Sequence, residues 1–102
     1  MTKISNEVLY KAYAFVKGFK GSQIDVENNI FVFAFDKGVT EEDVMADGML
    51  GKWFVDNGFN VSFEVRDFAY DTKGGWINYR GAVKGSGRVA YLRNRLVATI
   101  TW

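Results

Sequence analysis

The residues best suited to chemistry are aromatic and basic side chains in the last third of the chain. Trp76, Asn78 and Arg80 occupy alternating positions of a predicted strand, so they share one of its faces. An exposed aromatic ring beside arginines can stack on a base while the guanidinium groups pair with phosphates. Tryptophan, tyrosine and arginine also contribute most to binding at protein–protein interfaces. Both interpretations predict a binding surface.

The charge distribution extends this surface along the following residues. Residues 72–102 hold six basic and no acidic residues, whereas residues 1–71 hold seven basic and twelve acidic residues. A surface of one sign attracts partners of the opposite sign. The predicted partner-binding residues are Trp76, Asn78, Arg80, Lys84, Arg88, Tyr91, Arg93 and Arg95.

The partner predicted for this face is an acidic surface of another protein. A rigid fold with one complementary patch is sufficient for a non-catalytic inhibitor or adaptor. Small phage and mobile-element proteins that block host enzymes often have such a profile, which is an association and not a deduction from these residues. The alternative is a nucleic-acid-binding module that uses the same face. A third interpretation leaves the arginines solvated and without a partner.

Several kinds of catalysis lack their residues. The chain has no cysteine and no histidine, which removes thiolate chemistry, the commonest general base and the commonest zinc ligand. Phosphate-binding and serine-nucleophile motifs are also absent. We therefore predict no enzyme, no catalytic residue, no cofactor and no metal site. The remaining enzymatic hypothesis is a site that uses carboxylates and lysine, with magnesium for example, in a concave pocket lined by several of Asp25, Glu27, Asp36, Asp67 and Asp71.

The elements that must position these residues begin with a helix and a strand. Apolar residues recur at helical spacing over residues 5–19, and Ser5 or Asn6 can cap the first turn. Residues 30–35 form a continuous apolar run rich in phenylalanine. Its length and composition predict a strand that is covered on both faces.

The second predicted helix runs from Thr40 to Asn57 and carries the clearest end signals. Thr40 is the predicted N-cap, and three acidic residues follow it in the first turn, where they complement the helix dipole. Asn57 and Gly58 predict a left-handed C-cap, after which Phe59 is expected to touch the last turn. Gly48 and Gly51 lie inside this helix, and we interpret them as close packing against the sheet.

The rest of the chain predicts an antiparallel meander. Apolar and polar residues alternate from Val61 to Val65, and a bulge is expected at Asp67. Glycine-rich turns are predicted at 71–75 and 85–87. The predicted strands cover 60–70, 76–83, 88–92 and 96–102, the last two being either separate or one long strand bent at 93–95. The last strand is a candidate edge for pairing with a second copy, or else a central strand.

These elements define an α+β fold. Two helices are expected to pack on one face of a mostly antiparallel sheet, in the order α-β-α-β-β-β(-β). The length of 102 residues predicts a single domain, 1–102, and 48% hydrophobic residues suffice for its core. No apolar run reaches the length of a membrane span and no export signal is visible, so we predict a cytoplasmic protein that does not bind a membrane.

Overall fold

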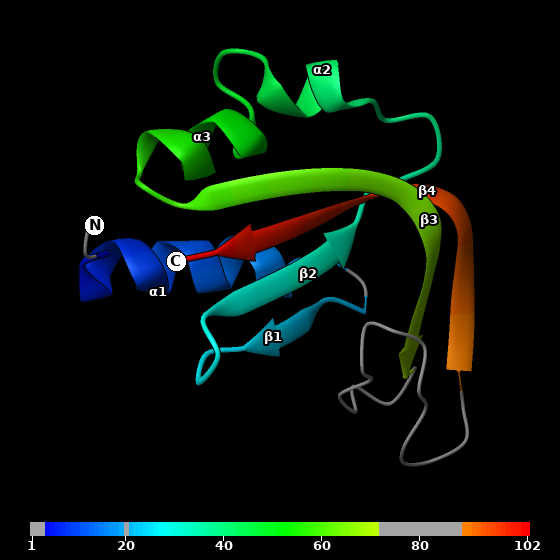
Figure 1. The fold of residues 1–102 in the computed structure, drawn as a ribbon, viewed down its shortest axis with the longest axis horizontal. Helices are drawn as coiled ribbons and strands as arrows, with labels where there is room; N and C mark the ends of the chain where they lie inside the picture. Colours follow the sequence, from blue (N-terminus) through cyan, green and yellow to red (C-terminus); the bar gives the residue numbers. More distant parts are fainter. Residues whose placement is uncertain (1–3, 20, 72–88) are drawn as a thin grey trace.

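The protein combines helices with an antiparallel sheet, which confirms the α+β prediction. The computed structural model describes residues 4–19, 21–71 and 89–102. Within these ranges the sheet has four strands in the order β1-β2-β4-β3 (Figure 1). The helices are α1 (Asn6–Lys17), α2 (Glu41–Met45) and α3 (Leu50–Asp56), and the strands are β1 (Gln23–Asp25), β2 (Ile30–Ala34), β3 (Asn60–Asp71) and β4 (Val89–Thr101). None of the described helices is long and apolar enough to cross a membrane.

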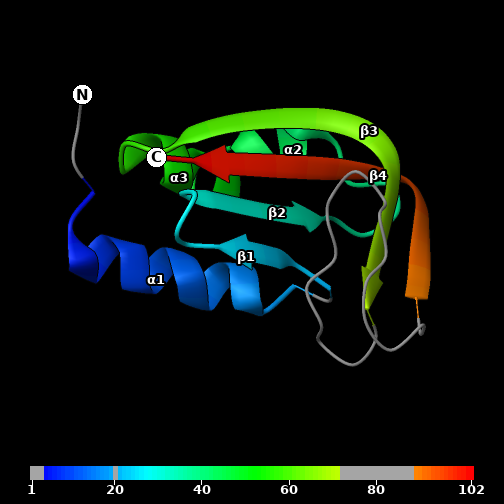
Figure 2. The same ribbon diagram turned by 60° about the horizontal axis from the view of Figure 1, so that its bottom comes forward.

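The first helix forms where its cap and apolar spacing predict it. The hydroxyl of Ser5 accepts a hydrogen bond from the backbone N–H of Val8 at 3.2 Å, and Ala12 and Val16 are fully buried. The helix lies alongside β1 and β2 (Figure 2). Strand β1 was not predicted, because its three residues are too few to show a pattern of alternation. It pairs with β2 through a turn in which Asn29 adopts a φ of +56°.

Strand β2 is covered on both faces, as predicted. Phe31 and Phe33 belong to a first hydrophobic cluster together with residues of α1, α2 and α3. Val32 and Ala34, which point to the opposite face, belong to a second cluster with Phe68 of β3 and Val97 of β4. The sheet therefore buries apolar side chains on two sides.

The second predicted helix is divided into two. Thr40 caps α2 as expected, since its hydroxyl accepts from the N–H of Asp43 and the Asp43 carboxylate accepts from the N–H of Thr40. Gly48 then adopts a φ of +80°, which interrupts the helix before α3 begins. A Cβ at Gly51 would lie 2.7 Å from the Met45 sulfur and 2.9 Å from the Val44 carbonyl oxygen. Gly51 thus packs α3 against α2 and not, as predicted, against the sheet.

The end of α3 follows the predicted C-cap. Gly58 has a φ of +92°, and the N–H of Phe59 donates to the carbonyl of Phe54 at 3.0 Å. The rings of Phe54 and Phe59 meet edge to face at a centroid separation of 5.2 Å. This contact joins the helix to the start of β3.

The last strand is central in the sheet. Residues 97–101 of β4 pair with β2 on one side, and the same residues pair with β3 on the other. No backbone edge is free there, so the pairing of this strand with a second copy is not supported. The predicted order of elements is not confirmed either, because β1 is additional and the second helix is divided. Residues 72–88, which include the predicted strand 76–83, lie outside the described residues.

Candidate protein-binding surface

The β3–β4 pair bends sharply after it leaves the sheet. Figures 1 and 2 show both strands turning together away from the line of β2. We call the part beyond the turn the distal arm; it comprises residues 68–71 of β3 and 89–92 of β4. Phe68 in this arm is fully buried, and it packs on Val32, Ala34 and Val97 in the second cluster. The arm therefore folds back onto the sheet.

A β-bulge produces the bend. Arg66 pairs with Arg95 and Phe68 with Leu92, so Arg93 and Asn94 together oppose the single residue Asp67. The extra residue lies in β4, although the sequence led us to expect it at Asp67 in β3. Two opposing residues on one strand bend and twist a strand pair. Residues 88–92 and 96–102 were predicted as two strands or one bent strand, and for its described residues 89–101 the second alternative is correct.

Asp67 closes the bulge from the facing strand. Its Oδ1 accepts a hydrogen bond from the backbone N–H of Asn94 at 3.0 Å, and its Oδ2 lies 3.8 Å from Nη1 of Arg93. Asn94 has a φ of +53°, a left-handed conformation that asparagine tolerates better than most residues. The carboxylate of Asp67 thus accepts a hydrogen bond from the irregular backbone of β4, and it also lies within ion-pair distance of an exposed arginine.

Replacing Asp67 distinguishes these two contacts. We expect Asp67→Ala to lower the free energy of unfolding by about 1 kcal/mol, because the N–H of Asn94 loses its acceptor. Asp67→Asn keeps a side-chain oxygen acceptor and removes only the charge, so it should cost less than about 0.5 kcal/mol, the usual size of an exposed ion pair. Urea denaturation measures both values. Equal losses for the two variants would contradict the role given to the Asn94 hydrogen bond.

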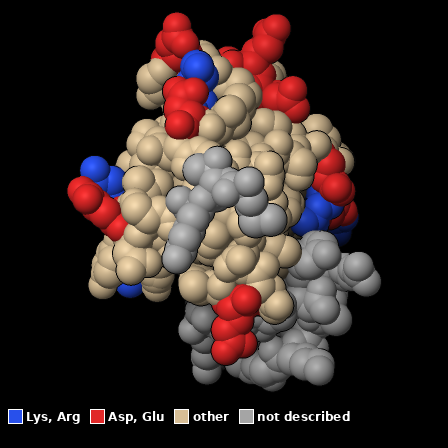
Figure 3. Space-filling view, turned by 60° about the vertical axis from the view of Figure 1, so that its left-hand side comes forward, with Lys and Arg blue, Asp and Glu red and all other residues tan. Residues whose placement is uncertain are grey.

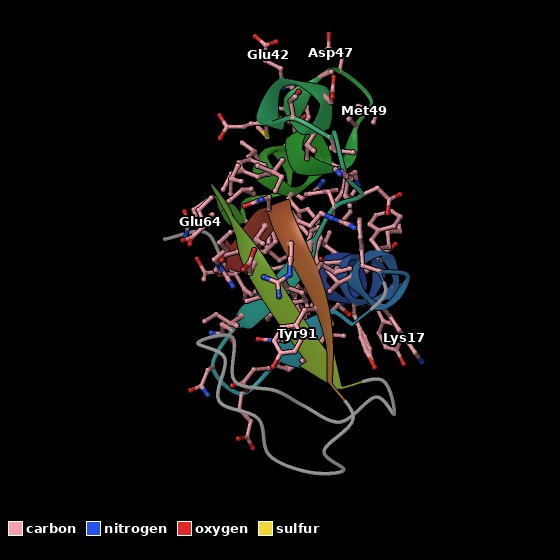
Figure 4. All side chains as sticks on the ribbon, turned by 90° about the vertical axis from the view of Figure 1, so that its right-hand side faces the viewer. Lys17, Glu42, Asp47, Met49, Glu64 and Tyr91 are labelled. Carbon is pink, nitrogen blue, oxygen red and sulfur yellow. The ribbon has the colours of Figure 1, made fainter. Side chains whose placement is uncertain are left out.

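The outer face of this bent pair presents apolar and aromatic side chains to solvent. We define it as Val65, Asp67 and Ala69 of β3 with Tyr91 and Arg93 of β4. Alternation places the three β3 residues on one face, and Tyr91 pairs with Ala69. Val65 is 68% exposed and Tyr91 is 61% exposed. Figure 4 looks at the bend and shows Tyr91 on the outside of β4.

Three of the eight predicted partner-binding residues lie within the described part of the chain. Tyr91 and Arg93 share the outer face. Arg95 does not: it is partly buried, and its Nη1 donates to the carbonyl oxygen of Phe35 at 3.4 Å. The other five lie outside the described residues; they are Trp76, Asn78, Arg80, Lys84 and Arg88.

Val65 was missed as a site residue because its pattern is that of a core residue. It alternates with Val61 and Phe63, and both of these pack against the first cluster. Val65 lies nearer the bend and remains exposed. The sequence around Val65 gives no signal for this difference. The exposure of Val65 depends on how far the helices that cover the sheet extend along β3.

The arginines of the bent pair have acidic neighbours on β3. Arg93 is near Asp67, and Nε of Arg66 lies 3.3 Å from Oε1 of Glu64. Arg66 also lies over the ring of Phe68, with its Cζ 5.7 Å from the ring centroid. On the outer face, Arg93 and Asp67 therefore place both signs of charge side by side, whereas Arg66 and Glu64 alternate to the opposite face of β3.

Several acidic side chains lie together at the α2–α3 end of the molecule, although others lie elsewhere on the surface. Figure 3 shows them at the end of the molecule formed by α2 and α3, where Glu41, Glu42 and Asp43 make up the first turn of α2. In the described part of the chain, no group of three or more carboxylates lies close enough together to hold a metal ion. Asp25 instead accepts hydrogen bonds from Asn28, and Asp67 closes the bulge.

The comparisons with known proteins add no relative to these observations. No protein family, curated protein or solved structure matches the chain. The features that bear on function are thus the exposed apolar residues and the mixed charges of the outer face itself.

Proposed function

We propose that this chain is a small non-catalytic binding protein, of inhibitor or adaptor type, that docks on a partner protein through the outer face. The observation that carries the proposal is the exposure of Tyr91 and Val65 on two hydrogen-bonded strands whose opposite face packs in the second cluster. Exposed apolar side chains on such a support lose little conformational entropy on binding, and tyrosine and arginine are the residues most often found at the energetic centre of interfaces.

The charges of the outer face favour a protein over a nucleic acid. A phosphate backbone docked on the outer face would meet the carboxylate of Asp67 beside Arg93. A protein surface can instead place an acidic group at Arg93, which is 79% exposed, and an apolar pocket at Tyr91. We therefore keep nucleic acid as an outcome of the test and not as a second proposal.

The experiment compares two exposed tyrosines, Tyr91 of the outer face and Tyr10 of α1. The purified protein captures its partner from extracts of the source cell, and the affinity is then measured with the isolated partner. We expect Tyr91→Ala to weaken binding by about 30-fold, the factor that corresponds to a hot-spot residue of roughly 2 kcal/mol. Tyr10→Ala removes a tyrosine of α1 that is 81% exposed and should leave the affinity unchanged.

Two results would contradict the proposal. One is equal affinity of the wild type and Tyr91→Ala for the partner. The other is micromolar binding of labelled DNA or RNA at about 50 mM salt that collapses at about 200 mM, because such a response is typical of phosphate contacts.

A further inference from the structure

A pocket lies where the end of α1, the end of β2 and the bend of β4 meet. Its volume is about 390 Å³, which is within the range of small-molecule sites. The pocket is separate from the outer face, since neither Tyr91 nor Arg93 lines it. Most of its wall is apolar; the lining residues are Gly18, Phe19, Ala34, Phe35, Asp36, Val39, Leu92 and Arg95.

Arg95 places a positive charge in this apolar wall, and its guanidinium group makes few hydrogen bonds. Its Nη1 donates one long hydrogen bond to the carbonyl oxygen of Phe35, and its buried Nε has no hydrogen-bond partner. Asp36 lines the same pocket but is exposed, and no ion pair joins it to Arg95 among the described residues. Within residues 4–19, 21–71 and 89–102, the guanidinium group of Arg95 therefore has no counter-ion.

The register of the strands explains this lack. Arg93 and Arg66 each have a carboxylate of β3 within 4 Å, from Asp67 and Glu64 respectively. Arg95 instead lies opposite Arg66, so its cross-strand neighbour is another cation. A partly buried charge without a counter-ion is costly, and a bound anion offsets that cost.

The chemistry of the wall indicates which anion fits. A guanidinium group pairs well with a carboxylate, and the rings and aliphatic side chains of Phe19, Val39 and Leu92 suit an apolar body. Asp36 disfavours ligands with two negative charges by repulsion. We propose that this pocket binds a small monocarboxylate whose body is aromatic or aliphatic, with Arg95 as the carboxylate-binding residue.

The first test compares matched probes on the wild-type protein at pH 7. Calorimetry measures the affinity of 3-phenylpropionate, of its neutral amide and of inorganic phosphate, and NMR chemical shifts locate the binding. The acid should bind at least about tenfold more tightly than the amide or phosphate, since only it offers a single charge on an apolar body. Its shifts should centre on Gly18, Phe35 and Leu92. Equal affinity for the amide or phosphate, or shifts elsewhere in the chain, would overturn the proposal.

The second test changes the charge of the pocket. Arg95→Gln should weaken binding of 3-phenylpropionate by at least about tenfold, while Arg95→Lys keeps a positive charge and should lose less. Lys52→Gln is the control, because it removes an exposed positive charge of α3 that does not line the pocket, and it should leave the affinity unchanged. Undiminished binding by folded Arg95→Gln would overturn the assignment of Arg95. If that variant does not fold, the wild-type comparison of acid and amide still decides.

Discussion

Phe54→Ala is expected to lower the free energy of unfolding by about 3–5 kcal/mol. Phe54 is fully buried in the first cluster, where its ring lies 5.2 Å from that of Phe59 and 6.3 Å from that of Phe33. Its removal leaves a cavity between α3 and the sheet, and it also removes the contact that closes the C-cap of α3. A domain of this size is stable by about 5–15 kcal/mol, so the loss should be visible as a large shift of the urea midpoint.

Val55→Ala is the matched control for this prediction. Val55 is the next residue of the same helix and is 44% exposed, so the change should cost less than about 0.5 kcal/mol. A loss below about 1 kcal/mol for Phe54→Ala would show that α3 does not pack on the sheet as described.

Local signals in the sequence predicted the ends of the elements better than their interiors. The cap at Thr40 and the turn at Asn57–Gly58 depend on residues a few positions apart, and both form as expected. The break at Gly48 could not be predicted in this way, because glycine is tolerated inside a helix and is also suited to a positive φ. The structure has the break, and the two helices on either side of it pack where Gly51 meets Val44 and Met45. Local sequence does not reveal such a contact between two helices.

The candidate surface could be predicted only up to the bulge. Simple alternation places Tyr91, Arg93 and Arg95 on one face of a strand. The extra residue opposite Asp67 shifts that alternation by one position, so Arg93 remains exposed while Arg95 turns inward beside Phe35. The bulge was expected at this level of the sheet, but its side could not be known from β3 alone because it depends on the register of both strands.

The same bend positions both proposed sites. It exposes Tyr91 on the outside of the β3–β4 pair, and it brings Leu92 and Arg95 to the pocket at the end of β2. The distal arm is held in place by Phe68 in the second cluster and by Nε2 of Gln23, a buried side chain, which donates to the carbonyl of Ala69 at 3.4 Å. Loss of this packing should therefore affect both sites at once.

Phe68→Ala tests this coupling and is the second change with a large expected effect. Phe68 is fully buried, so its truncation should cost about 3–5 kcal/mol, as for other buried phenylalanines. Because the second cluster is small, we expect part of this loss to appear as local opening of the arm. Amide hydrogen exchange should accelerate in residues 68–71 and 89–92 more than at Phe31 and Phe33 of β2, which lie in the first cluster.

Val65→Ala is the control in the same strand, since Val65 is exposed and its truncation should change stability by less than about 0.5 kcal/mol. Phe68→Leu keeps most of the apolar volume and should retain most of the exchange protection. If Phe68→Ala leaves exchange in the arm unchanged, the second cluster does not hold the bend. If exchange accelerates while binding of 3-phenylpropionate stays the same, the pocket does not depend on the arm that contributes Leu92 to its wall.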